Sequence, residues 1–134
     1  LQNCGKYGRL YIYESAQTIC KSIGEDWQLP STSEWTNLIS HYGGIYIDSI
    51  QNGKKAYAYL LKTGAKNFQA LLGGNKNRDG TYGRLHAHGF YWTSSELDDQ
   101  QSGFLNFAKG RETFFLQPEM EKVRALSVRC IKRK

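Results

Sequence analysis

Apolar residues recur at helical spacing in the first half of the chain. The clearest case is residues 31–44, where four apolar positions follow the i, i+3, i+4, i+7 pattern: Trp35, Leu38, Ile39 and Tyr42. Ser31 and Glu34 have the spacing of a capping box, and Gly43 and Gly44 follow the last apolar position. The pattern predicts a helix that begins near Thr32 and packs one face on a core.

Two further segments carry helical signals. In residues 13–24 the spaced positions are Ala16, Ile19, Cys20 and Ile23, followed by Gly24 as a stop. We therefore expect Cys20 to face inward. A third helix is predicted within residues 54–64, between a turn at Asn52 and Gly53 and a stop at Gly64.

The second half of the chain is rich in short β-forming runs. These runs are residues 90–95, 103–108, 112–117 and 125–131, and residues 9–13 provide an early partner. A glycine- and asparagine-rich stretch, residues 73–89, has the composition of a long loop. Helices followed by strands predict an α+β fold, with helices packed on one antiparallel sheet.

Composition and charge narrow the classes of protein. The chain of 134 residues with 40% hydrophobic residues is the size of one domain, so we expect a single domain over residues 1–134. The net charge of +6 is concentrated near the end of the chain, at Arg124, Arg129, Lys132, Arg133 and Lys134. We read this tail as solvated and expect no nucleic-acid partner. No stretch approaches the roughly 18 apolar residues of a membrane span, so we expect a soluble mature or excised piece without membrane insertion.

The three cysteines do not have the spacing of a zinc site. Cys4, Cys20 and Cys130 include no CxxC pair and are not paired in sequence with the histidines. The residues alone leave two possibilities open, which are one disulfide with one free thiol, or three reduced cysteines.

The loop at residues 73–89 contains the candidate ligands for a metal. Asn75, Asn77, Asp79 and the glycine after them resemble the start of a calcium loop, but position twelve is His86 instead of glutamate. His86 and His88 would share one face of a strand, yet two imidazoles are too few for a structural site. We expect no metal and no cofactor, and a turn stabilised by asparagine side chains. No catalytic motif of the common hydrolase, metalloprotease or nucleotide-binding kinds occurs, which favours a protein that is not an enzyme.

Five ordered segments together resemble one known family. They are YGRLYIYESAQTIC, DWQLPSTSEW, FQALLGGNKNRDGTYG, GFYWTSSE and LSVRCIK. In this order they resemble the Fibrobacter succinogenes major paralogous domain, a family of bacterial extracellular modules, from about Tyr7 to Lys132. The chain departs from the family in having CKSIGEDW where a Cys-Pro-Gly step often precedes the tryptophan, and in lacking the usual upstream segment.

The resemblance implies a fold, a disulfide and a location. The family is similar to the C-type-lectin-like fold, with two main helices packed on a twisted antiparallel sheet, long loops, and first and last strands that lie together. In that fold a cysteine of the first helix commonly bonds one of the last strand, which corresponds here to Cys20 and Cys130. The implied location is secreted or at the cell surface. The sequence Gln117-Pro118-Glu119 echoes a lectin triplet, but no Trp-Asn-Asp element accompanies it, so calcium-dependent sugar binding is not expected.

The resulting hypothesis is a noncatalytic binding module, of a kind that can form one part of a larger protein, that recognises a glycan or a surface protein through loops 73–90 and 94–102. The candidate ligand-binding residues are Asn75, Asn77, Arg78, Asp79, Tyr82, His86, His88, Glu96 and Asp98. The first alternative is a structural or assembly domain of a larger surface or fimbrial protein. The second is an enzyme of the formylglycine-generating kind, which would need a pair of redox-active cysteines.

Overall fold

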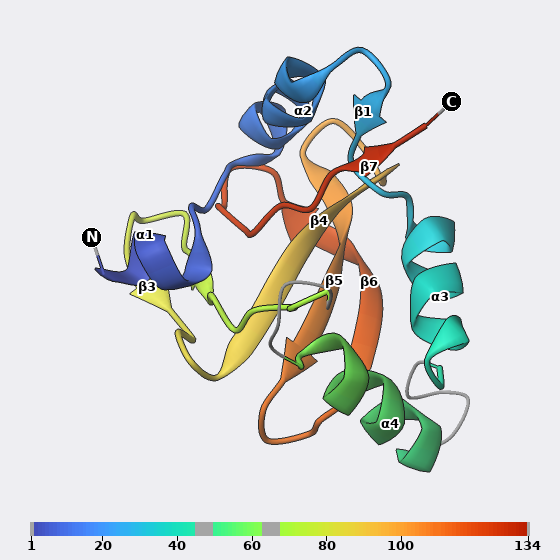
Figure 1. Cartoon of the computed structure of the whole chain (residues 1–134). Helices are drawn as coiled ribbons and strands as arrows, with labels where there is room; N and C mark the ends of the chain where they lie inside the picture. Colours follow the sequence, from blue (N-terminus) through green and yellow to red (C-terminus); the bar gives the residue numbers. More distant parts are fainter. Residues whose placement is uncertain (1, 45–49, 63–67, 134) are drawn as a thin grey trace.

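A computed structural model describes residues 2–44, 50–62 and 68–133. Figure 1 shows the arrangement of its helices and strands. The helices are α1 (Gln2–Tyr7), α2 (Tyr13–Ile23), α3 (Thr32–His41) and α4 (Ile50–Leu60). The strands are β1 (Trp27–Gln28), β2 (Asn75–Lys76), β3 (Tyr82–Gly83), β4 (His88–Glu96), β5 (Gln101–Ala108), β6 (Phe114–Glu121) and β7 (Ile131–Lys132). The fold is thus a mixture of α and β structure, as predicted.

The centre of the domain is a three-stranded antiparallel sheet with the order β4-β5-β6. These strands confirm three of the four predicted runs of the meander. The prediction of one sheet is wrong, because β1 pairs with β7 and β2 with β3 in two separate antiparallel pairs. The run 125–131 does not become a fourth strand of the meander, since Ser127 forms a parallel bridge with Tyr91. The early run 9–13 contributes only the bridge between Tyr11 and Leu126, because α2 already begins at Tyr13.

Helix α3 begins as its sequence predicts. Ser31 is the N-cap, its hydroxyl accepts a hydrogen bond from the Glu34 amide at 3.1 Å, and the Glu34 carboxylate accepts one from the Ser31 amide at 2.8 Å. This capping box satisfies backbone donors that the first turn would otherwise leave free. Trp35 and Ile39 are buried, and Leu38 and Tyr42 pack against the same core.

The other helices correct the sequence predictions in part. In α2 the buried face consists of Tyr13, Ala16 and Cys20, whereas Ile19 and Ile23 are 36% and 56% exposed. Cys20 therefore faces inward, as expected, but two of its three predicted apolar companions do not.

Helix α4 starts earlier than predicted. It begins at Ile50 and runs through Asn52 and Gly53, where we expected a turn. Its Ala56, Tyr57 and Leu60 are buried in the core, and such packing commonly overrides a local turn preference. The predicted stop at Gly64 lies outside the described residues. With α1, which the sequence pattern did not indicate, the described residues form four helices, whereas the pattern predicted three and the family resemblance implied two main ones.

The two faces of the central sheet build two separate cores. The first core lies against α3 and α4 and contains Trp35, Ile39, Ala56, Tyr57, Leu60, Ala70, Tyr91, Leu105, Phe107 and Phe114. The second core lies against α2 and contains Tyr13, Ala16, Cys20, Leu29, Phe90, Trp92, Phe104 and Leu126. Successive side chains of a strand point to opposite faces, so Tyr91 enters the first core while Phe90 and Trp92 enter the second. A disulfide between Cys20 and Cys130 confirms the expected pairing and fastens α2 to the segment that leads into β7.

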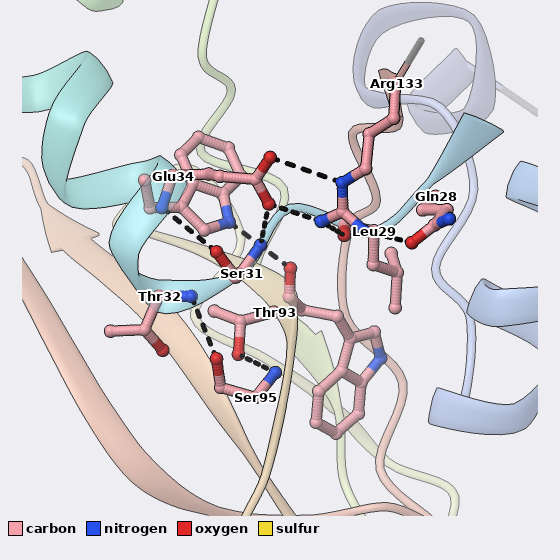
Figure 2. A network of polar contacts seen from close by, with 10 residues as sticks. Gln28, Leu29, Ser31, Thr32, Glu34, Thr93, Ser95 and Arg133 are labelled. Carbon is pink, nitrogen blue, oxygen red and sulfur yellow. Dashed lines mark hydrogen bonds and ion pairs between the residues drawn. The ribbon is translucent and has the colours of Figure 1, made fainter. Parts of the chain in front are cut away.

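A polar network connects the start of α3 to the end of the chain (Figure 2). Arg133, the residue after β7, forms an ion pair with Glu34 and a hydrogen bond with Gln28 of β1. On the other side, the Thr32 amide donates to the Ser95 hydroxyl of β4 at 3.0 Å. The motif around the capping box therefore fastens α3 to the sheet and to the last strand, which is a structural role.

This network predicts an acid-dependent contribution to stability. Burial alone would raise the pKa of Glu34, but hydrogen bonds from Arg133 and Ser31 outweigh it and hold the pKa below its ordinary value of 4.5. A carboxyl with a lowered pKa stabilises the folded state above its unfolded-state pKa, and this contribution is lost as the pH falls through the lowered pKa. In urea unfolding at pH 7, we expect Glu34→Gln to lower the free energy of unfolding by about 0.5 to 1 kcal/mol.

The matched control for Glu34 is Glu14→Gln, which removes an exposed carboxylate from α2. The difference between the wild-type protein and Glu34→Gln should shrink as the pH is lowered below 4.5. A difference that stays constant down to strongly acidic pH would show that the charge of Glu34 does not act in this way.

Candidate functional site

The face of the central sheet that carries the second core is left uncovered by α2 in one part, and this part forms a groove. It has a volume of about 440 Å³ and is lined by Asn75, Arg84, His88, Phe90, Gln101, Phe104, Asn106, Gln117, Glu119, Met120, Glu121 and Arg124. An adjoining hollow of about 840 Å³ is lined by Arg78, Asp98, Asp99, Gln100, Gln101, Glu121, Lys122 and Val123. Gln101 and Glu121 line both spaces, so we treat them together as the sheet-face groove. It brings the loop before β4 and the loop between β4 and β5 to one place.

The bottom of the groove is apolar and aromatic. Phe90 of β4 and Phe104 of β5 are only 6% and 7% exposed and belong to the second core. The His88 imidazole stacks on the Phe90 ring with centroids 5.6 Å apart and planes 7° from parallel. These rings are held by the strands themselves, which gives the groove a rigid floor.

Amide side chains surround this floor. Asn75, Gln101, Asn106 and Gln117 come from β2, β5 and β6 and all line the groove. Each amide offers a carbonyl acceptor and two N–H donors. The Asn106 Oδ1 lies 3.3 Å from the His88 Nδ1. Gln117 is exposed, so its amide is accessible to a ligand.

A chain of hydrogen bonds fixes the β2–β3 hairpin that forms one wall. Arg84 Nη1 donates to Asn75 Oδ1 at 3.2 Å, and Asn75 Nδ2 donates to Asn77 Oδ1 at 2.9 Å. Arg124 Nη1 donates to the same Asn77 oxygen at 3.0 Å. Gly74 allows the hairpin to fold back at this point, since a Cβ there would lie 2.3 Å from the Gly83 carbonyl oxygen and its φ is +66°.

Ion pairs join the hairpin to the end of β6. The Glu121 carboxylate lies 3.0 Å from both Arg124 Nε and Arg78 Nη1. Hydrogen bonding from Arg124, with the charges of both arginines, lowers the pKa of Glu121. Beside it, Lys122 and Glu96 form a pair at 2.6 Å, which raises the pKa of Lys122. The rim of the groove therefore holds charged groups that already have partners.

The candidate calcium loop is a hydrogen-bonded turn. Asp79 Oδ1 accepts hydrogen bonds from the Thr81 amide at 2.9 Å and from the Thr81 hydroxyl at 2.6 Å, and these bonds lower the pKa of Asp79. Asn77 and Asn75 are used in the hairpin network described above. Within residues 2–44, 50–62 and 68–133, no group of three or more His, Cys, Asp or Glu side chains is placed to hold a metal ion.

The structure gathers some predicted site residues and separates others. Four of them line the groove: Asn75, Arg78, His88 and Asp98. Three more support it through bonds to neighbouring residues: Asn77, Asp79 and Glu96. Tyr82 and His86 lie away from it. His86 has a φ of +66° before β4 and forms a hydrogen bond with Tyr7, so it does not share a strand face with His88 as we expected.

Other groove residues were missed in the sequence. They include Arg84, Gln101, Asn106, Gln117, Glu119 and Arg124. Asn106 and Gln117 sit inside runs that were read as core strands, where single polar residues at alternate positions were the available signal. The sequence does not show which of the two sheet faces remains open, so that signal could not be assigned to a site.

The fold and the groove define a disulfide-bonded mixed α and β domain with an open, polar hollow on its sheet. The model of the Fibrobacter succinogenes major domain matches residues 1–132, and the chain belongs to this family. Comparison with curated proteins and with solved structures returned no match. Among the described helices, none is both long and apolar enough to cross a membrane.

Proposed function

We propose that this domain is a noncatalytic module, secreted or at the cell surface, that binds a glycan in the sheet-face groove. The observation that carries the proposal is the set of three amide side chains that are not buried, those of Gln101, Asn106 and Gln117, around a floor of buried phenyl rings. Sugar hydroxyls both donate and accept hydrogen bonds, and amides match them in both roles. The apolar face of a pyranose ring suits an aromatic floor.

The charges of the groove favour a neutral glycan. Its lining contains four cationic and four anionic side chains: Arg78, Arg84, Lys122, Arg124, Asp98, Asp99, Glu119 and Glu121. Several of these are paired with each other or with hairpin residues. A charged ligand would have to disrupt the ion pairs that stabilise the wall. Sugar hydroxyl groups can instead bond to the acceptors and donors that these pairs leave unused.

The disulfide supports the proposed location and the noncatalytic role. Disulfides persist mainly in oxidising compartments such as the periplasm and the cell surface. Cys20 is fully buried and bonded to Cys130, which leaves Cys4 as the remaining cysteine of the chain. The pairing of β1 with β7 and the disulfide between α2 and the last segment also support our proposal of a C-type-lectin-like fold.

Two groove variants test the proposal. In binding to the neutral glycan that a glycan array ranks first, Gln117→Ala and Asn106→Ala should each weaken affinity roughly fivefold or more, because leaving a ligand group without its hydrogen-bond partner costs about 1 to 3 kcal/mol. The matched control is Asn37→Ala, which removes an exposed amide on α3. Arrays that stay blank at high protein concentration, or groove variants that bind as well as the control, would reject glycan binding in this groove.

A structural or assembly role is the second candidate, and one observation favours it. Strand β6 is the last strand of the central sheet and has no strand partner on its outer side among the described residues. An open edge can accept a strand from another chain, although Pro118 in its middle opposes such pairing. Concentration-dependent self-association that Pro118→Val strengthens would support this role over glycan binding.

A further inference from the structure

A second hollow also borders the β2–β3 hairpin. It has a volume of about 680 Å³ and is bounded by α1, the segment 8–12 and the hairpin. We call it the tyrosine cleft, after Tyr7, Tyr11 and Tyr82. Its lining also includes Asn3, Cys4, Arg9, Ile12, Ser15 and Lys76. Asn75, which is buried, is the one residue among the described lining sets that belongs to both spaces.

Large apolar and aromatic side chains are accessible in this cleft. Tyr82 is 72% exposed, and Ile12 is 41% exposed. The Lys76 Nζ lies 5.5 Å from the centroid of the Tyr82 ring, in position for a cation–π contact. Exposed aromatic rings beside a cleft commonly serve as contact surfaces for a ligand.

The charge of the cleft differs from that of the groove. Among the described residues that line the cleft, Arg9 and Lys76 are the cationic ones and none is an aspartate or glutamate. Neither cation forms an ion pair within the part of the chain that the structure describes. The cleft therefore has a positive potential that nothing in its own lining neutralises.

Backbone bridges hold the walls of the cleft in place. The Lys76 amide donates to the Ala125 carbonyl at 2.9 Å, and the Ala125 amide donates back at 3.0 Å. The Tyr11 amide donates to the Leu126 carbonyl at 2.8 Å, with a return bond at 3.0 Å. The hairpin and the segment before α2 are thus both fixed to the same C-terminal segment, which makes the cleft preformed.

We infer that the tyrosine cleft binds an acidic sugar, a pyranose that carries a carboxylate. The carboxylate would pair with Arg9 or Lys76, the two cations among the described residues that line the cleft. The exposed Tyr82 ring would contact the apolar face of the sugar. Asn3 and Ser15 offer polar groups to its hydroxyls. This site is distinct from the neutral groove, so the domain has two sugar sites of different charge preference.

Cys4 provides a local reporter for this site. It is exposed, lines the cleft, and is the cysteine of the chain outside the disulfide. The experiment measures the rate of Cys4 alkylation on the intact protein in the presence of trigalacturonic acid at increasing concentration. Saturating ligand should slow alkylation at least threefold, and the same trisaccharide with its carboxyl groups reduced to alcohols should not.

Charge variants identify the side chains responsible. Lys76→Glu and Arg9→Glu should each abolish the protection of Cys4 by trigalacturonic acid. Tyr82→Ala should lower the affinity for this ligand at least threefold. Lys54→Glu makes the same charge change on the exposed side of α4 and should leave the protection unchanged. Gln117→Ala should also leave it unchanged, which separates this site from the groove.

Several results would overturn the inference. Equal protection by the reduced trisaccharide would show that the cleft does not prefer an acidic ligand. Equal protection by hexaglutamate would show that it does not prefer a sugar. Absence of protection by trigalacturonic acid, or protection that survives both Lys76→Glu and Arg9→Glu, would show that the cleft does not bind this class of ligand.

Discussion

Reduction of the disulfide between Cys20 and Cys130 should lower the free energy of unfolding by about 4 to 5 kcal/mol, because the bridge closes a very long loop in the unfolded chain. The two cysteines are 110 residues apart in sequence. Cys20 is also fully buried in the second core, so the bond joins α2 to the segment before β7 at a packed position. The measurement is urea unfolding with and without reductant.

The experiment is best made on Cys4→Ser, because this variant removes the exposed thiol and prevents exchange with the bridge. The mass of alkylated protein before and after reduction verifies that two thiols have been released. A reduced protein that unfolds at the same urea concentration as the oxidised protein would contradict the proposed contribution of the disulfide.

Replacement of Trp92 by alanine should destabilise the fold by about 3 to 5 kcal/mol. Trp92 is fully buried in the second core, and its ring makes an edge contact with Tyr13 at a centroid distance of 5.2 Å. Its Nε1 donates to the Tyr11 carbonyl at 2.7 Å, so the substitution also leaves a backbone acceptor without its partner. Chemical unfolding monitored by circular dichroism measures the loss.

The control for Trp92 is Tyr82→Ala, which removes a large aromatic side chain that is 72% exposed. We expect it to change the free energy of unfolding by less than about 0.5 kcal/mol. If the two variants were equally stable, Trp92 would not have the structural role that its burial and its hydrogen bond indicate.

Elements with local signals were predictable from the sequence. Helix α3 carries its own start at Ser31 and Glu34 and its own apolar stripe, and the structure confirms both. Strands β4, β5 and β6 were found for a similar reason, since each is a β-forming run bounded by turns. Residues alone left the state of Cys20 and Cys130 open, and the family resemblance provided the correct pairing.

Elements that depend on distant contacts were not predictable in the same way. The start of α4 at Ile50 contradicts the turn signal of Asn52 and Gly53, because packing of the helix on the sheet decides its length. The outward direction of Ile19 and Ile23 depends on where α2 meets the sheet. The pairing of β1 with β7 joins segments at opposite ends of the chain.

In the candidate site, too, local composition was readable from the sequence, whereas contacts between distant segments were not. Loop composition directed attention to residues 73–90, but the amides of Asn106 and Gln117 belong to strands. Their exposure results from the short reach of α2, which covers Trp92 and leaves the neighbouring part of the sheet open. A sequence pattern reports which residues share a strand face, whereas the helix that covers that face is set by the tertiary fold.

The most direct test of glycan binding is a nuclear magnetic resonance titration of the ¹⁵N-labelled protein with the neutral glycan that the array ranks first. Once assigned, the side-chain amide signals of Gln101, Asn106 and Gln117 report on these three groups. We predict that these signals shift with saturation, while the amide of Asn37 on α3 stays in place. Shifts confined to residues outside the sheet-face groove, or no shifts at saturating glycan, would contradict the proposed function.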